Sequence, residues 1–316
     1  MKIIYTDIQK KHNPIYEIYD GVKESYAEKK ERITSIVSAL KENNYTDFIS
    51  PHHFPLSNIT SLHHIAYFNF LSNRTKKIKE GEELYPSYFI MDTYTPLTKY
   101  TFEAAMASAN VALTGAELIL NGEKICYSLC RPPGHHAEER SSGGYCYFNN
   151  AAIAANYLSS QGRVAILDID YHHGNGTQHF FYERNDVLYV SLHADPNLKF
   201  PYNSGFVDEI GKGKGEGFNK NYPLPLNISN IEYANILKRA LKDIRDYKPN
   251  FLIVSAGFDT YEKDPIAGFA LTIPFYKEIG QIISSLTMPK LIIQEGGYNI
   301  DDLGRIVVSF LKGFIK

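Results

Sequence analysis

Two carboxylates and an imidazole stand at alternate positions directly after an apolar run in this sequence. The run covers residues 164–167, and Asp168, Asp170 and His172 follow it. Side chains two apart on an extended chain point the same way, and an unbroken apolar run is typical of a strand buried on both faces. The pattern therefore predicts metal-binding side chains at the carboxyl end of a strand. The alternative, a helix-capping Asp168 beside incidental surface histidines, accounts for one D-x-D but not for D-x-D-x-H-H-G-N-G.

A third carboxylate ends another apolar run. Asp259 follows residues 251–255 in the segment AGFD. With Asp170 and His172 it would provide three protein ligands and leave an open coordination position, which is the mark of a catalytic metal site. One nitrogen and two carboxylate ligands suit Zn²⁺, and they would also accept Fe²⁺, Co²⁺ or Mn²⁺. Taken alone, Asp259 could equally be a turn residue or a helix N-cap.

Two further strand ends carry groups that could move protons or stabilise charge. His135 and His136 follow the predicted strand 125–129 in the segment RPPGHHA, where both rings can turn toward one cleft. Tyr298 follows the predicted strand 291–294 after a double glycine. A histidine pair can serve as general base and acid, and a tyrosine hydroxyl can donate to a developing oxyanion. The alternative for Tyr298 is one more surface tyrosine among the 24 in the chain.

These residues need elements that bring separate strand ends together. Apolar runs predict strands at 2–5, 125–129, 164–167, 187–192, 251–255 and 291–294. Periodic patterns predict helices at 31–40, 102–120, 148–158, 177–182, 231–247, 274–286 and 301–315, the last capped by Asp301 or Asp302. Alternating strands and helices favour an α/β fold of three layers, with a mostly parallel central sheet between helices. The carboxyl ends of parallel strands share one edge, so the polar groups can converge there.

Two long segments show no clear period. Residues 72–100 are too long for a simple connection, so we expect a functional loop or an interaction segment. Residues 195–229 contain the run GKGKGEG, which resembles a phosphate-binding loop. Because no predicted strand precedes this run and no predicted helix follows it, a flexible loop is the better interpretation.

Composition narrows the class of protein. The 316 residues include 33 basic and 35 acidic side chains, for a net charge of −2. A general nucleic-acid binder needs an excess of Lys and Arg, so we expect no nucleic-acid partner. Three cysteines without C-x-x-C spacing indicate reduced thiols, and no apolar run is long enough to span a membrane. We therefore expect a cytoplasmic protein with no membrane partner, folded as a single domain over 1–316.

Several motifs, in this order and spacing, resemble the zinc-dependent deacetylase family. They are RPPGHHA (131–137), DIDYHHGNGT (168–177), SLHADP (191–196), SAGFDTYEKDP (255–265) and EGGY (295–298). This family includes histone deacetylases and bacterial acetylpolyamine amidohydrolases, and it has the arginase-like α/β fold. The N-terminal NPIYEIYDG and the GKGKGEG run make the acetylpolyamine amidohydrolases the more similar branch.

The resemblance implies roles for the residues at the strand ends. Asp170, His172 and Asp259 correspond to the zinc ligands. His135 and His136 correspond to the general base and acid, and Tyr298 corresponds to the donor that stabilises the transition state.

The resemblance also implies a second metal site and residues that support the two histidines. Asp168 would brace His135, and it would bind a structural K⁺ together with Ser191 and backbone carbonyls. Those carbonyls belong to Asp170, His172 and Leu192. Asn175 stands where many histone deacetylases carry Asp, and an amide cannot raise the basicity of His136 as a carboxylate would.

The substrate tunnel is implied by further matches. Tyr145 and Phe200 correspond to its aromatic walls, and Glu17 and Glu83 to acidic residues at its mouth. A third acidic position appears here as Tyr94, with Asp92 nearby. Carboxylates at a narrow entrance would attract an ammonium group. Alternatively, Glu83 is an ordinary solvated charge. The inserted loop at 72–100 corresponds to a segment that narrows the tunnel and builds a homodimer.

The expected reaction is metal-assisted hydrolysis of an acetamide. The substrate would be an N-acetylated polyamine or a related small acetylated amine, and the products would be acetate and the free amine. The alternative is a protein lysine deacetylase, which needs an open mouth that the 72–100 insertion would obstruct.

Overall fold

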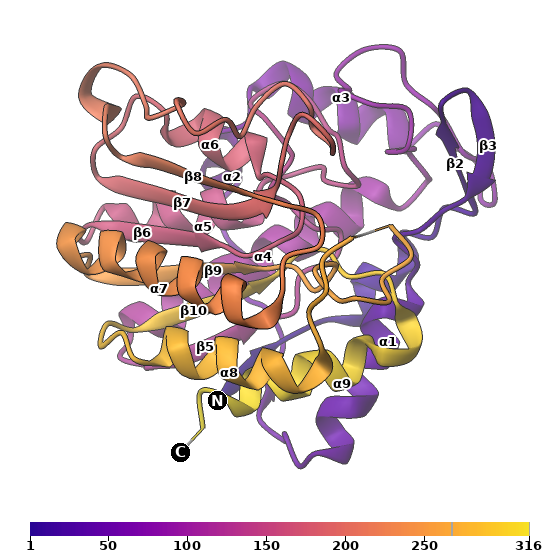
Figure 1. Ribbon diagram of the computed structural model, residues 1–316. Coiled ribbons are helices and arrows are strands. Elements are labelled where there is room, and N and C mark those ends of the chain that lie inside the picture. The colour runs from indigo at the N-terminus through magenta and orange to yellow at the C-terminus, as the bar shows by residue number, and fades with distance from the viewer. Residues whose placement is uncertain (267, 316) are drawn as a thin grey trace.

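The computed structural model describes residues 1–266 and 268–315. Its centre is an eight-stranded sheet with the order β4-β1-β5-β10-β9-β6-β7-β8, and every neighbouring pair is parallel (Figure 1). The strands are β1 (Lys2–Ile4), β4 (Phe48–Ile49), β5 (Ile125–Ser128), β6 (Val164–Asp168), β7 (Val187–Ala194), β8 (Asn219–Leu224), β9 (Phe251–Ala256) and β10 (Lys290–Gln294). The predicted α/β class with a parallel central sheet is therefore confirmed. The division into one domain stays a prediction.

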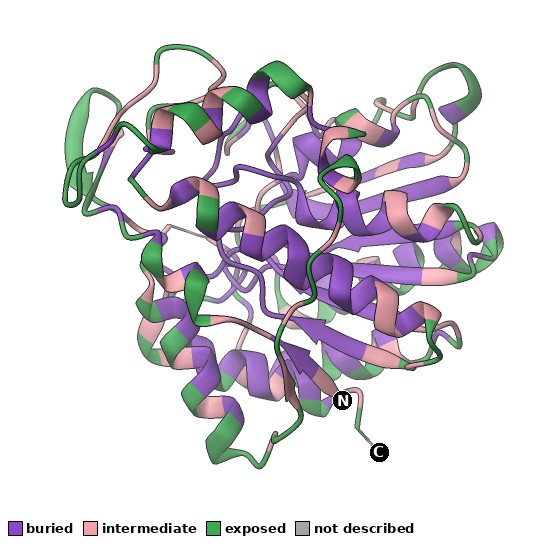
Figure 2. Cartoon of the chain, turned by 180° about the vertical axis from the view of Figure 1, so that it is seen from behind, coloured by how far each residue is buried: buried purple, intermediate pink, exposed green. Residues whose placement is uncertain are grey.

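Helices cover both faces of the sheet because the strands are apolar on both. In β6, Ala165 and Leu167 pack in one core, whereas Val164 and Ile166 pack in another. The first core is shared with α1 (Glu31–Glu42), α7 (Asn230–Tyr247), α8 (Ile273–Ser284) and α9 (Ile300–Lys312). The second is shared with α4 (Thr101–Leu120) and α5 (Asn150–Ser159). Figure 2 shows the strands buried between these two layers.

The chain also forms several further elements outside the central sheet. They are α2 (Ser57–Thr60), α3 (Ile65–Thr75), α6 (Asn175–Phe181), the 3₁₀ turns Asp7–Lys11 and Gly213–Gly215, and the antiparallel hairpin of β2 (Tyr16–Tyr19) and β3 (Val22–Ser25). The hairpin projects from the body of the molecule in Figure 1.

Three local predictions were wrong. The segment 195–229 contains the edge strand β8. No apolar pattern predicts this strand, because its buried positions include Asn219 and Asn221. An edge strand tolerates these amides since they donate to Gln178 Oε1 at 2.8 and 2.9 Å. The last helix is capped by Asn299, not by Asp301 or Asp302, and the Asn299 side chain accepts from Asp302 N. Residues 72–75 belong to α3, so the irregular segment is shorter than 72–100.

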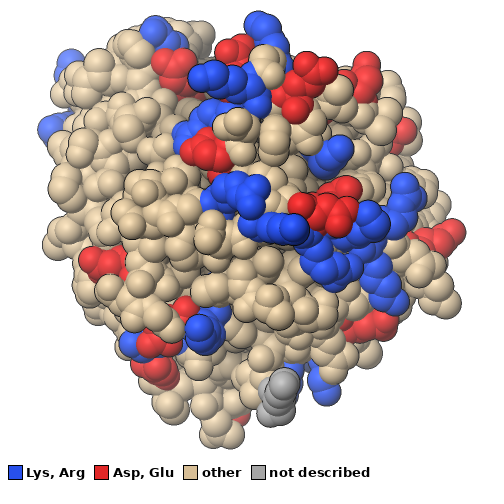
Figure 3. Space-filling view, turned by 90° about the vertical axis from the view of Figure 1, so that its left-hand side faces the viewer, with Lys and Arg blue, Asp and Glu red and all other residues tan. Residues whose placement is uncertain are grey.

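The surface carries charges of both signs. Figure 3 shows Lys and Arg side chains lying among Asp and Glu side chains on the face turned to the viewer. Opposite charges form ion pairs such as Lys242–Asp246 (2.6 Å) and Arg184–Asp186 (2.6 Å), as expected for a chain with nearly equal numbers of basic and acidic residues. Within 1–266 and 268–315, no helix is both long and apolar enough to cross a bilayer.

Candidate active site

Four neighbouring strands bring the predicted chemical groups together. β5, β10, β9 and β6 are adjacent in the sheet, and each is followed by one of the polar segments. β6 leads to Asp170 and His172, and β9 leads to Asp259. β5 leads to the two histidines of RPPGHHA, and β10 leads to Tyr298. The convergence follows from the parallel order, because all four chains leave the sheet at the same edge.

Asp170, His172 and Asp259 form a compact group of possible metal ligands. One ligand atom from each residue lies within 4.8 Å of the other two. His172 Nδ1 is 2.9 Å from Asp259 Oδ2 and 3.4 Å from Asp170 Oδ1. Both carboxylates are buried, whereas the His172 side chain is 13% exposed. His172 also lines a cavity, so the group meets a space that a substrate can enter.

The backbone around this group fits a bound ion. A Cβ at Gly296 would lie 2.7 Å from both Asp170 Oδ2 and Asp259 Oδ2, so only glycine leaves the two carboxylates room to approach each other. Gly296 N also donates to Asp170 Oδ2 at 2.8 Å, and Tyr171 N donates to Asp259 Oδ1 at 2.9 Å. Two fixed buried carboxylates beside an imidazole are costly without a cation. The donor set therefore fits zinc, and its chemistry also admits Fe²⁺ or Co²⁺.

The histidine pair lies beside the ligand group, and each ring has a different partner. His135 Nδ1 donates to Asp168 Oδ2 at 3.2 Å, and the same oxygen accepts from Tyr189 Oη at 3.0 Å. His136 Nδ1 lies 2.8 Å from Asn175 Oδ1. The two imidazole rings are 4.0 Å apart. Of the two, His136 lines the pocket.

Different surroundings move the pKa values of the two histidines in opposite directions. Burial lowers the pKa of His136 well below its ordinary value, and the neighbouring His135 and His172 lower it further. Burial also opposes the charged form of His135, but the carboxylates of Asp170 and Asp168 outweigh it and raise its pKa to about 10. A neutral His136 can accept a proton, as a general base must.

The loop that carries Tyr298 is fixed from two sides. Asp264 Oδ2 accepts from Tyr298 N at 2.7 Å. From the other side, Arg32 donates to Gly297 O at 2.5 Å and to Glu295 O at 2.6 Å. Its guanidinium also lies 5.0 Å from the centre of the Tyr298 ring. The phenol is 7% exposed and lines the pocket, so its hydroxyl is available to a bound ligand.

A cavity of about 330 Å³ leads to this group. Phe200 forms one part of its wall, with its ring 4.9 Å from that of His136, and the Tyr145 ring lies 5.5 Å from that of Tyr298. Gly144 closes the wall, since a Cβ there would lie 2.1 Å from the His136 ring. The rest of the lining includes Tyr19, Tyr94 and Tyr202. The cavity is therefore mostly aromatic.

Glu17 lies in this cavity, but Glu83 does not line it. The Glu17 carboxylate is 6% exposed and accepts from Tyr145 Oη at 3.2 Å and from Ala27 N at 3.1 Å. Burial raises the pKa of Glu17 to about 7. Glu83 instead accepts from Ile15 N, from Tyr16 N at 3.1 Å and from Tyr85 Oη at 2.8 Å, and it lines a separate cavity. The structure therefore gives Glu83 a place as a loop anchor and not in the substrate cavity.

The residues expected around a potassium ion also lie near one another. Ser191 is the register partner of Asp168 across β6 and β7, and Leu192 follows it in β7. Both are fully buried. The Ser191 hydroxyl lies 2.8 Å from His193 Nδ1. A potassium site here stays a prediction.

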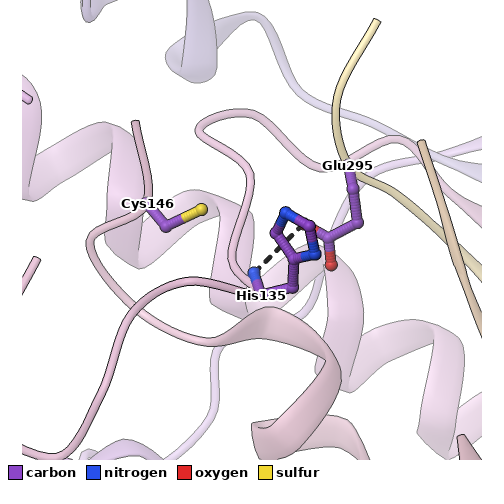
Figure 4. A group of neighbouring side chains, drawn as sticks. All are labelled: His135, Cys146 and Glu295. Atoms are coloured by element: carbon purple, nitrogen blue, oxygen red, sulfur yellow. Dashed lines mark hydrogen bonds between the residues drawn. The ribbon is translucent and has the colours of Figure 1, made fainter. Parts of the chain in front are cut away.

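A second group of possible metal ligands lies beside the first. It consists of His135, Cys146 and Glu295, all buried (Figure 4). The Glu295 carboxylate already accepts from Gly134 N at 2.7 Å and from His135 N at 3.3 Å. Burial raises the pKa of the Cys146 thiol well above its usual value, which favours the protonated form. This group therefore suits a structural role better than metal binding.

Several residues that shape the site were not predicted as functional. Asp92, noted only as an acidic neighbour of Tyr94, accepts from Gly144 N at 2.5 Å and so ties the insertion to the pocket wall. Arg32 carried no recognisable signal, because it lies in an ordinary amphipathic helix. Glu295 had one, since it directly follows β10 just as Asp259 closely follows β9. The same strand-end argument would have identified it.

Comparisons with known proteins agree with this geometry. The chain matches the Histone deacetylase domain family over residues 26–314. It is 38% identical to "Acetylpolyamine amidohydrolase 2" of Pseudomonas aeruginosa, over 99% of this chain and 98% of that protein. It is also 38% identical to "Acetylpolyamine amidohydrolase" of Mycoplana ramosa, over 99% of both chains.

A solved structure extends the similarity to the fold. The acetylpolyamine aminohydrolase from Burkholderia pseudomallei superposes with a TM-score of 0.94 at 36% identity, covering 99% of this chain and 98% of that chain. These matches confirm the resemblance of the sequence motifs. The chain therefore belongs to the histone deacetylase domain family, and it is a deacetylase.

Proposed function

We propose that the protein removes acetyl groups from N-acetylated polyamines or related small amines and releases acetate and the free amine. One observation carries the proposal: the buried Glu17 lines the same aromatic cavity as His136 and Tyr298. An acetylated alkyl chain suits aromatic walls, and its distal ammonium group would be drawn to the Glu17 carboxylate. The similarity to acetylpolyamine amidohydrolases over nearly the whole chain supports the same substrate class.

In this proposal the metal is held by Asp170, His172 and Asp259. When bound, zinc supplies a Lewis acid that polarises a carbonyl and lowers the pKa of a water molecule to ~7. Side chains of the protein carry out the proton transfer and stabilise the oxyanion. His136 takes the proton of the attacking water at Nε2, since its Nδ1 is occupied by Asn175. Tyr298 donates its hydroxyl to the oxyanion that develops on the acetyl group.

The leaving amine needs a proton, which comes from the histidine pair. His135 or His136 can supply it, and Asp168 holds the ring of His135 in orientation. A structural K⁺ on Asp168, Ser191 and the carbonyls of Asp170, His172 and Leu192 would stiffen the β6 and β7 ends that carry these groups. We assign this ion no chemical step.

The insertion and the hairpin both carry exposed apolar side chains. Tyr88 in the insertion is 55% exposed, and Val22 and Tyr19 in the hairpin are 58% and 46% exposed. Exposed apolar groups of this kind favour a protein interface. The proposed partner is a second copy of the chain, which light scattering on the purified protein would detect as a homodimer.

A substrate panel tests the proposal. Acetate release is measured with acetylputrescine, acetylcadaverine, acetylspermidine, acetylspermine and acetyl-lysine peptides, on enzyme reconstituted with Zn²⁺ or Co²⁺. The small amines should have the higher kcat/KM. If peptides are cleaved faster, the protein is a lysine deacetylase and the substrate assignment is wrong. If no substrate releases acetate, the hydrolytic function itself is wrong.

A further inference from the structure

The tautomer of His136 depends on which way the Asn175 amide faces. The amide oxygen accepts a hydrogen bond, and the amide NH₂ group donates one. With the oxygen 2.8 Å from Nδ1, as here, Nδ1 carries the proton and Nε2 keeps a free lone pair. A reversed amide would place the proton on Nε2 and leave the ring unable to accept one there. The amide orientation therefore decides whether His136 can act as a base.

A carboxylate outside the cavity fixes this orientation. Asn175 Nδ2 donates to Glu138 Oε1 at 2.9 Å. An ionised carboxylate only accepts hydrogen bonds, so the amide must turn its NH₂ group toward Glu138 and its oxygen toward His136. The same NH₂ group is 3.3 Å from His136 O and 3.5 Å from Met91 Sδ. These longer contacts involve neutral acceptors, which bind more weakly than a carboxylate.

The main chain at Glu138 is held in place by two hydrogen bonds. Its backbone nitrogen donates to Ser141 O at 3.0 Å, and its carbonyl accepts from the buried His63 Nδ1 at 2.9 Å. The side chain lines a second cavity, of about 690 Å³, together with Asn175 and Arg184. Arg184 is engaged elsewhere, with Asp186 at 2.6 Å. The chain His136–Asn175–Glu138 thus runs from the substrate cavity to another cavity and ends in a carboxylate whose main chain is held in place.

We propose that Glu138 is a positioning residue for the catalytic base: it locks the Asn175 amide and so selects the His136 tautomer whose Nε2 accepts a proton. This inference rests on the proposed role of His136 in deacetylation. In this chain the amide of Asn175 stands directly beside His136, and the carboxylate of Glu138 lies beyond that amide. The amide transmits the orientation set by Glu138 to His136.

Glu138→Gln tests the lock while keeping the shape of the side chain. Glutamine presents either an oxygen or an NH₂ group, so the amide of Asn175 loses its strongest constraint and can reverse more easily. We expect kcat to fall roughly tenfold and KM to stay within about twofold, as for other outer partners of catalytic histidines. Thermal stability and zinc content should match the parent enzyme. The matched control is Glu139→Gln in the same loop, whose carboxylate lies 3.6 Å from Arg140, and it should keep the parental kcat.

A second background separates positioning from general structure. Asn175→Asp gives His136 an acceptor that is the same in either orientation. The new carboxylate, however, lies within hydrogen-bond distance of the Glu138 carboxylate, and we expect the repulsion between them to lower activity. Adding Glu138→Gln relieves that repulsion, so the double variant should be more active than Asn175→Asp alone.

Two results would overturn the proposal. One is a parental kcat in Glu138→Gln, and the other is the same loss from Glu138→Gln in both backgrounds, which marks independent effects. A parent enzyme that releases no acetate would instead overturn the proposed function, and that result is seen before any variant is made.

Discussion

The floor and the mouth of the substrate cavity are built differently. The floor consists of Asp170, Asp259 and the histidine pair, which are all at most 3% exposed and follow strands of the central sheet. The mouth includes Tyr19 and Tyr202, which are 46% and 53% exposed and belong to a projecting hairpin and a loop. Side chains at the floor are each held by named hydrogen bonds, whereas the mouth is held by a few anchors such as Glu83 and Asp92.

This difference separates chemistry from selection. A rigid sheet edge positions reacting groups within fractions of an ångström, whereas loops set which molecules enter. Changes at the floor should therefore lower kcat for every substrate. Changes at the mouth should alter KM and should do so only for substrates that carry the recognised charge.

The largest effect is expected from removing a ligand at the floor. Asp259→Asn loses one of two carboxylates, so the bound metal should be lost together with several kcal/mol of transition-state stabilisation. We expect kcat/KM to fall by about a thousandfold or more. Zinc content by mass spectrometry and acetate release measure the two effects. Full zinc content with parental activity would remove Asp259 from the site.

Tyr298→Phe should separate the oxyanion donor from the metal. The variant loses one hydroxyl and should lower kcat by about 10²- to 10³-fold, while zinc stays bound because Tyr298 is not in the ligand group. Tyr247→Phe is the matched control, since this buried tyrosine at the end of α7 donates to Asn185 O just before β7 begins, whereas the site lies at the carboxyl ends of the strands. Equal kcat in the two variants would show that Tyr298 takes no part in turnover.

At the mouth, Glu17 should make binding pH-dependent. Burial, together with the charges of Asp92 and Glu24, raises its pKa to about 7 against the hydrogen bonds from Ala27 N and Tyr145. The carboxyl is neutral below that pH and charged above it, so the KM for acetylputrescine should fall as pH rises from 6 to 8.

Glu17→Gln should remove this pH dependence and raise KM about tenfold at pH 8, equivalent to 1.4 kcal/mol. The neutral analogue N-butylacetamide serves as the substrate control, and its KM should be the same in both enzymes. A tenfold rise for both substrates would mean that Glu17 shapes the cavity and does not recognise charge.

The smallest effect on catalysis is expected at Glu83. Because its carboxylate accepts from the backbone at Ile15 and Tyr16, Glu83→Ala should lower the free energy of unfolding by about 1 kcal/mol. The KM for acetylated amines should be unchanged. Denaturant unfolding and steady-state kinetics check the two parts. A large rise in KM with unchanged stability would show that Glu83 recognises the substrate and does not only anchor the loop.

The same contrast explains what the sequence could predict. Asp168, Asp170, His172 and Asp259 were predictable because apolar strands end in polar residues at a shared sheet edge, and that rule depends on short stretches of chain. The strand β8 was not predicted because its buried Asn219 and Asn221 depend on hydrogen bonds to Gln178, which is distant in sequence.

Contacts across the fold also account for the missed site residues. Glu138 and Asn175 are 37 residues apart, and Asp92 and Gly144 are 52 apart. No local pattern marks such pairs, since their meeting depends on how loops from different strands pack. Glu83 was misplaced for the same reason: its carboxylate is taken up by backbone donors 67 and 68 positions away.

The position of the bound metal tests the proposed catalytic site. Anomalous diffraction at the zinc edge, from crystals of the protein reconstituted with Zn²⁺, should show one strong peak between Asp170, His172 and Asp259. A peak instead at His135, Cys146 and Glu295, or none beside Asp170 and Asp259, would contradict the assignment of the catalytic metal to Asp170, His172 and Asp259.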